Sequence, residues 1–151
     1  GVIEFLKCSE YYKYDPNISF TLIGDPLTDD PTGVQLKTVN KYVIDKAIIY
    51  MGYQEDIYNY IANASCIVLP SYREGMSTVL LEASVHKRPI ITTKVPGCID
   101  IIKDSSYGIL CEPRDYRSLL QAMQKFIKLD HLEISMMVDK TFNHVKNKFS
   151  S

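Results

Sequence analysis

The chain has 151 residues with a formal net charge of −1, and 46 % of its residues are hydrophobic and 23 % charged. This length suits one globular domain with a sizeable core, and the near-neutral charge argues against a strongly basic nucleic-acid-binding protein. No apolar run approaches the roughly 20 residues that a membrane span needs. We therefore expect a cytoplasmic protein, whose whole form could lie at the inner face of the plasma membrane.

The cysteines and the first residues add two expectations. The four cysteines include no CxxC pair and have no histidine at metal-ligand spacing, so we expect reduced thiols and no metal site. They are Cys8, Cys66, Cys98 and Cys111. The first residues already carry a helical pattern, with no Met and no leading strand. We read residues 1–151 as a single domain that is a fragment of a longer protein.

Helical and strand patterns alternate along the chain. The expected helices, in chain order, cover residues 2–14, 34–43, 55–64, a segment from Ser77 onward, 99–102, 115–129 and much of 131–149. The expected strands cover residues 17–24, 47–52, 66–70, 89–93 and 107–112. Apolar strands that alternate with helices predict an α/β fold of the Rossmann-like kind, with a parallel sheet flanked by helices on both faces.

Ligands of open α/β sheets bind at the carboxyl ends of the strands, which here are the loops after Ile23, Met51, Thr93 and Cys111 and, with the most informative residues, the loop after Leu69. This loop reads "YREGMST", and the next helix begins near Ser77. The free N–H groups at a helix start favour an anion, Ser77 or Thr78 can cap the helix, and Gly75 lets a ligand approach the backbone. The segment therefore predicts a phosphate site made mostly of main chain.

Two glutamates, Glu74 and Glu82, stand on either side of this helix start. Glu82 lies between Leu81 and Ala83, where a charge is costly unless it is paired or used. Both carboxylates could accept hydrogen bonds from sugar hydroxyls, or both could simply face water. A glycosidase pair needs a separation of about 5–9.5 Å, whereas eight residues of helix span about 12 Å, so we reject that alternative.

The surrounding residues carry a family resemblance. Residues 48–115 contain Glu74, seven residues and Glu82, followed by an Ala-containing helix and the strand Pro89-Ile90-Ile91. This arrangement resembles the C-terminal domain of retaining GT-B glycosyltransferases of family four, and the likeness extends to both ends of the chain. The loop "GDPLTDDPTG" and the turn "VPGC" resemble most the subgroup that builds bacterial capsule, lipopolysaccharide O-chain or exopolysaccharide.

The resemblance implies transfer of a hexosyl group from a nucleotide diphosphate sugar, UDP-linked by expectation, to a glycan or lipid-linked acceptor, without a metal. It implies that Glu74 contacts the donor sugar as the catalytic residue and that Glu82 binds the ribose. The implied backbone contacts to the sugar and diphosphate come from Gly75, Met76, Ser77, Thr78 and Val79, and those near the base from Gly52 and Tyr53. The acceptor-binding N-terminal domain and a Lys that precedes Gly1 in the family lie outside this chain.

Three departures and two alternatives accompany this interpretation. The family often has Pro where Ser77 stands, Gly where Lys87 stands and Glu where Asp100 stands. A nucleotide-sugar epimerase of GT-B architecture and a non-catalytic nucleotide-binding α/β domain remain open. The acidic pair Asp29–Asp30 is expected to be a solvated turn rather than a metal motif.

Overall fold

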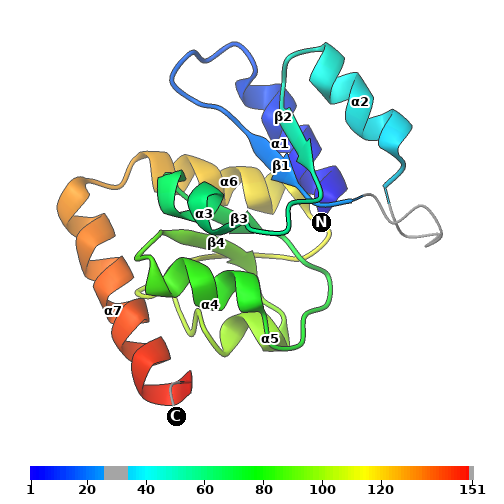
Figure 1. Ribbon diagram of the computed structural model, residues 1–151. Helices are drawn as coiled ribbons and strands as arrows, with labels where there is room; N and C mark the ends of the chain where they lie inside the picture. Colours follow the sequence, from blue (N-terminus) through cyan, green and yellow to red (C-terminus); the bar gives the residue numbers. More distant parts are fainter. Residues whose placement is uncertain (26–33, 150–151) are drawn as a thin grey trace. The chain divides into compact units, whose positions relative to one another are not determined.

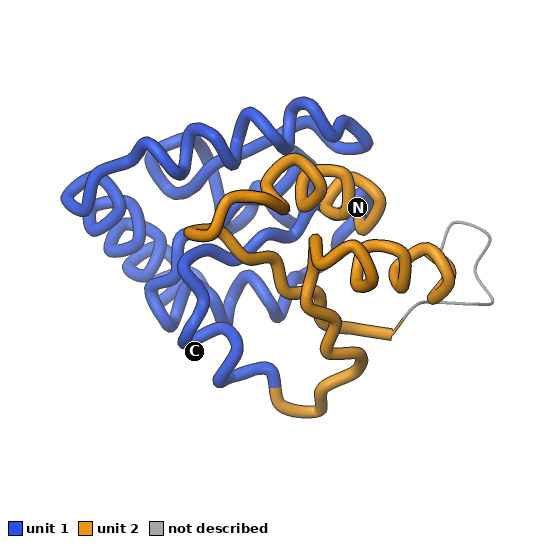
Figure 2. Tube along the Cα trace, turned by 90° about the horizontal axis from the view of Figure 1, so that it is seen from above, with its two compact units in different colours: residues 1, 57–151 blue, residues 2–56 orange. Residues whose placement is uncertain are grey.

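The computed structural model describes residues 1–25 and 34–149, so the Asp29–Asp30 pair lies outside the described residues. The chain folds into two compact units, drawn in different colours in Figure 2. Unit 1 holds Gly1 and residues from Ile57 onward, and unit 2 holds Val2–Asp56.

Unit 2 is built from two helices and two parallel strands. Its elements are α1 (Val2–Tyr12), β1 (Thr21–Ile23), α2 (Leu36–Ile44) and β2 (Ile49–Gly52). Thr21 of β1 pairs with Ile49 of β2, and the register shifts by one residue before Ile23. Fully buried Leu6 and the edge-to-face rings of Phe5 and Phe20, 5.2 Å apart, pack its interior.

Unit 1 holds three parallel strands in the order β3-β4-β5. Its elements are α3 (Tyr58–Asn63), β3 (Ile67–Leu69), α4 (Thr78–Val85), β4 (Ile90–Thr93), α5 (Pro96–Ile99), β5 (Ile109–Cys111), α6 (Tyr116–Ile127) and α7 (His131–Phe149). Figure 1 shows α4 and α5 on one side of this sheet and α6 on the other. All four residues of the central strand β4 are buried, which places the core of the unit at this strand.

The parallel α/β class predicted from the sequence is confirmed, and each of the five expected strands is present. The strand hydrogen bonds, however, form two sheets in the described residues, β1-β2 and β3-β4-β5, where the sequence suggested one. Apolar periodicity predicts that a strand is buried, but it contains no information about which strand it pairs with.

The short helix expected at residues 99–102 instead begins at Pro96 and ends at Ile99. Pro96 and Gly97, in the turn "VPGC", are expected from the sequence to form a loop before this helix. Proline is well suited to the first position of a helix, where its missing N–H would have no partner and its fixed φ already matches the helix. The prediction of a loop at these two residues was therefore wrong.

No helix in the described ranges is long and apolar enough to cross a bilayer.

Candidate functional site

The loop between β3 and α4 is anchored to the central strand by two buried threonines. The hydroxyl of Thr92 donates to the carbonyl oxygen of Leu69 at 2.8 Å, and that of Thr93 donates to the carbonyl oxygen of Ser71 at 2.6 Å. Both threonines are at most 1 % exposed, so these bonds are shielded from water. The first residues of the loop therefore leave the sheet in a fixed position.

Within this loop, the half-buried Glu74 is held by a neighbouring hydroxyl and by tight backbone packing. Ser71 Oγ donates a hydrogen bond of 2.8 Å to Glu74 Oε2. A Cβ added to Gly97, at the start of α5, would overlap the carbonyl oxygens of Gly75 and Glu74. Only glycine fits there, so α5 packs directly against the backbone that carries the Glu74 carboxylate.

The start of α4 has the geometry that the sequence predicts. Ser77 is 1 % exposed and its Oγ accepts a hydrogen bond of 3.2 Å from the backbone N–H of Leu80. The N–H groups of Thr78 and Val79 belong to the first turn and have no acceptor within the helix. Gly75, Met76 and Thr78 are exposed, so this end of the helix opens to solvent. An anion can reach these amides, favoured by the positive end of the helix dipole.

Glu82 lies one turn further along α4, and its side chain is 51 % exposed. Its charge in an otherwise apolar helix is therefore solvated. The nearest basic group is Nε2 of His86, 4.0 Å from Oε2 of Glu82. The His86 ring stands edge-on to the Tyr58 ring with centroids 4.2 Å apart, and its buried Nε2 has no hydrogen-bond partner among the described residues.

The predicted site residues thus fall into two groups. Glu74, Gly75, Met76, Ser77, Thr78 and Val79 are consecutive on the loop and the start of α4, and Glu82 lies on the same helix. Gly52 and Tyr53 belong to unit 2, where Gly52 ends β2 with a φ of +63° and Tyr53 is 67 % exposed. The donor roles of all these residues stay predictions.

The structure adds residues of the loop that follows β5, a strand end where the sequence predicts a ligand but where no site residue was named. The guanidinium of Arg114 lies over the ring of Tyr72, 4.8 Å from its centroid, which joins this loop to the loop of Glu74. Lys94 Nζ, after β4, contacts Glu112 Oε1 at 2.9 Å, and this hydrogen bond raises the pKa of Lys94. The signal in the sequence was the basic residue after Glu112-Pro113, at the carboxyl end of a strand.

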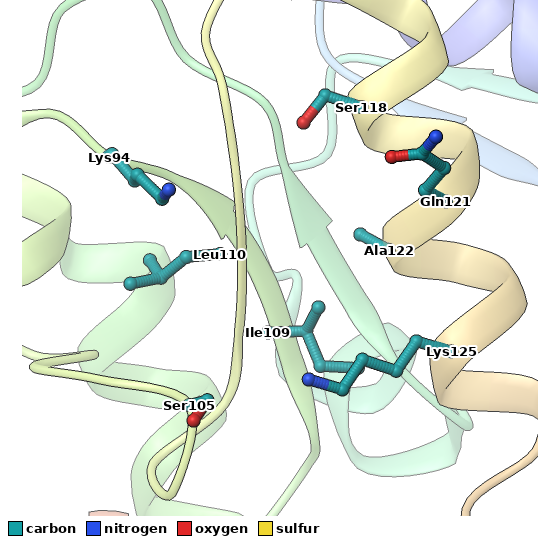
Figure 3. A pocket seen from close by; sticks show the side chains of 8 residues that line it. All are labelled: Lys94, Ser105, Ile109, Leu110, Ser118, Gln121, Ala122 and Lys125. Atoms are coloured by element: carbon teal, nitrogen blue, oxygen red, sulfur yellow. The ribbon is translucent and has the colours of Figure 1, made fainter.

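A hollow of about 340 Å³ lies between β5 and α6 (Figure 3). It is lined by Lys94, Ser105, Ile109, Leu110, Ser118, Gln121, Ala122 and Lys125. None of the residues predicted to bind the donor belongs to this lining, so the hollow is separate from the start of α4.

Two metal-related expectations concern cysteines and acidic residues. The four cysteines form no disulfide, and burial raises the pKa of the Cys66 thiol to about 12 and that of the Cys111 thiol to about 11. Among the described residues, no group of three or more His, Cys, Asp or Glu side chains could hold a metal ion. The metal-independent reaction stays a prediction.

Comparison of the sequence with known protein families and curated proteins identifies a family and several relatives. The family described as "Glycosyl transferases group 1" matches residues 4–128. A curated relative from Staphylococcus aureus, the capsular polysaccharide biosynthesis glycosyltransferase CapM, is 29 % identical over 109 residues, which cover 69 % of this chain and 27 % of CapM. The N,N'-diacetylbacillosaminyl-diphospho-undecaprenol α-1,3-N-acetylgalactosaminyltransferase of Campylobacter jejuni is 26 % identical over 136 residues, covering 90 % of this chain and 34 % of that enzyme. The chain thus spans about a third or less of the length of these relatives.

Solved structures share the fold. Anabaena Alr3699/HepE in complex with UDP superposes with a TM-score of 0.84 at 17 % identity, over 99 % of this chain and 41 % of that one. HepE has also been solved with UDP-glucose. The C-terminal domain of the group 1 glycosyl transferase LpcC from Francisella tularensis superposes with a TM-score of 0.80 at 24 % identity, over 99 % of this chain and 80 % of that domain.

Proposed function

This chain belongs to the glycosyl transferases group 1 family, and on that premise we propose that it binds the UDP-sugar donor of a retaining hexosyltransferase. In the proposal, the acceptor is a hydroxyl of a polysaccharide or lipid-linked glycan, bound by a second domain of the same protein. The reaction would take place at the inner face of the plasma membrane, where lipid-linked acceptors are reached, and would need no metal.

One observation carries the proposal: an exposed helix start with a carboxylate on each side. The amides of Thr78 and Val79 are positioned for the diphosphate, because the Ser77 cap leaves them without an acceptor. Glu74 precedes these amides and is oriented by Ser71, while the half-exposed Glu82 follows them on α4. Carboxylates accept hydrogen bonds from sugar hydroxyls, so Glu74 suits the donor sugar and Glu82 the ribose.

The same geometry supplies chemistry in the transition state. When the bond from the anomeric carbon to the diphosphate breaks, positive charge develops on the sugar and negative charge on the departing diphosphate. Preorganised N–H donors that face such developing charge contribute about 2.7–4 kcal/mol each to transition-state stabilisation. The Glu74 carboxylate would orient the sugar while the α4 amides receive the leaving group.

Titration calorimetry of this chain with UDP and UDP-glucose tests the donor site. We expect weak binding of both ligands, weaker binding of both in Glu82→Ala, and a selective loss of UDP-glucose affinity in Glu74→Ala. Glu10→Ala removes an exposed glutamate in unit 2 and serves as the matched control. If the unaltered chain binds neither ligand, the proposed donor site is refuted.

Activity of the full-length protein separates transfer from the epimerase alternative. We expect Glu74→Ala chiefly to lower kcat and Glu82→Ala chiefly to raise the KM for the donor, because only the first carboxylate contacts the reacting sugar. Interconversion of UDP-sugars in the absence of any acceptor would favour the epimerase instead.

A further inference from the structure

Arg114 is held in a backbone conformation that only glycine adopts freely. Its φ is +60°, in the left-handed region where the Cβ of an ordinary residue crowds the following carbonyl. Such a conformation persists only where the surrounding structure fixes it, and it is a reason to look for a function.

Contacts on both sides of Arg114 fix this turn. Before it, Glu112 is bound by Lys94 at 2.9 Å, and the backbone N–H of Glu112 donates to Ser118 Oγ at 2.9 Å. After it, the carboxylate of Asp115 accepts a hydrogen bond of 3.0 Å from the backbone N–H of Ser118 and caps α6. The end of β5 and the start of α6 are thereby tied together, and Arg114 occupies the turn between them.

The strained turn places the Arg114 guanidinium over the Tyr72 ring, at 4.8 Å from the ring centroid. Within residues 1–25 and 34–149, the Arg114 side chain forms no ion pair. The contact that the conformation of Arg114 makes possible is therefore the stack of its guanidinium on the Tyr72 ring. Tyr72 directly follows Ser71, whose hydroxyl holds the Glu74 carboxylate at 2.8 Å. A cation on the aromatic face therefore restrains the loop that orients Glu74.

We propose that Arg114 is a positioning residue for the donor sugar, which acts through Tyr72 and Ser71 on the carboxylate of Glu74. The proposal rests on the proposed donor site but adds a residue outside the loop and α4. It also predicts which affinity changes: loss of Arg114 weakens binding of the sugar, which Glu74 contacts in the proposal, and leaves binding of the nucleotide unchanged.

The test uses Arg114→Gly in this chain, with hydrogen exchange of the amides of residues 71–76 as a ligand-free measurement. Glycine relaxes the backbone but removes the stack, so we expect faster exchange in this loop. We also expect a dissociation constant for UDP-glucose about 3- to 5-fold higher, and one for UDP within about 2-fold of the original. Arg114→Lys keeps a cation over the ring and should restore part of the UDP-glucose affinity.

Lys46→Gly is the matched control, because Lys46 has the same φ of +60° but lies at the end of α2 in unit 2. It should leave the exchange of residues 71–76 unchanged. Tyr72→Leu should match Arg114→Gly in its loop exchange and its UDP-glucose affinity, and the double variant should be no worse than either single one.

Unchanged loop exchange in Arg114→Gly overturns the proposal, as does an equal loss of UDP and UDP-glucose affinity, which would indicate direct contact with the diphosphate. Failure of the unaltered chain to bind either ligand refutes the donor site and with it the effect of Arg114 on sugar binding, whereas unchanged loop exchange in Arg114→Gly refutes the role of Arg114 even where both ligands bind.

Discussion

The starts of α4 and α6 are closed by side-chain caps, Ser77 for α4 and Asp115 for α6. Replacing either residue by alanine exposes a backbone N–H without an acceptor, so we expect each variant to lower the free energy of unfolding by about 1 kcal/mol. Urea unfolding measures this cost. Only Ser77→Ala should also weaken UDP binding, since its cap lies beside the amides proposed to hold the diphosphate. A stability loss in Asp115→Ala without one in Ser77→Ala would contradict the role of the Ser77 cap.

Gly75 and Gly97 lie close together, but there is open space beside Gly75 and no space for a side chain at Gly97. An added methyl group at Gly97 would overlap the carbonyl oxygens of Glu74 and Gly75, whereas one at Gly75 would meet nothing within 4 Å. We therefore expect Gly97→Ala to lower the free energy of unfolding by about 1–3 kcal/mol, as overpacking does. Gly75→Ala should leave stability nearly unchanged and reduce UDP-glucose affinity, because its methyl group would project toward the ligand. Thermal unfolding and calorimetry on both variants measure the contrast, and equal stabilities would show that α5 moves freely.

The residues of the site differ in how far the sequence reveals them. The sequence offers Ser77 or Thr78 as the cap of α4, and the structure shows that the cap is Ser77. The close approach of Gly97 to Glu74 joins segments more than 20 residues apart, and no local pattern predicts it. The Tyr72–Arg114 stack is equally non-local, which is why sequence reasoning missed it.

At the scale of elements, α2 and α4 end in the same way, with a lysine in the left-handed conformation. The φ values are +60° at Lys46 and +52° at Lys87. In each case the N–H of the lysine bonds to the carbonyl three residues back, and the next N–H bonds to the carbonyl five residues back, as in a Schellman motif. This geometry explains why the related family often has glycine where Lys87 stands.

Replacing each of these lysines by glycine should therefore stabilise the chain. We expect Lys46→Gly to raise the free energy of unfolding by about 0.5–1 kcal/mol, since relief of strain exceeds the added entropy of the unfolded state. The gain should be smaller for Lys87→Gly, because Lys87 also pairs with Asp139 at 3.0 Å and lies over the Phe142 ring of α7. Urea titrations of both variants test the order, and destabilisation by Lys46→Gly would be inconsistent with a strained helix end.

The elements themselves were largely predictable, and their exact ends were not. Helix α7 runs from His131 to Phe149, as the pattern indicates, because its apolar spacing is sustained over five turns. The first helix stops at Tyr12 rather than Tyr14, and the first strand is confined to Thr21–Ile23. Local composition determines whether a segment is helix or strand, whereas the ends depend on tertiary contacts that composition does not contain.

For the molecule as a whole, the thiols of the half-buried Cys66 and the buried Cys111 make stability depend on alkaline pH. Burial raises the pKa of Cys66 to about 12 and that of Cys111 to about 11, against 9.0 for an exposed thiol. The folded chain therefore keeps these protons when the unfolded chain loses them. The stability from this difference is complete below pH 9 and is lost progressively as the pH rises through 9 to about 11 for Cys111, and to about 12 for Cys66.

Urea unfolding at pH 8 and pH 10, under reducing conditions, measures this dependence. We expect the free energy of unfolding to fall by about 1 kcal/mol per thiol between the two pH values, because one pKa unit corresponds to about 1.4 kcal/mol. Cys66→Ala and Cys111→Ala should each start from a lower stability at pH 8, since each leaves a cavity, but should lose less of it by pH 10. The slope with pH is thus the informative quantity, because packing losses act equally at both pH values. Identical slopes in the original chain and in both variants would show that these thiols do not contribute to the alkaline loss.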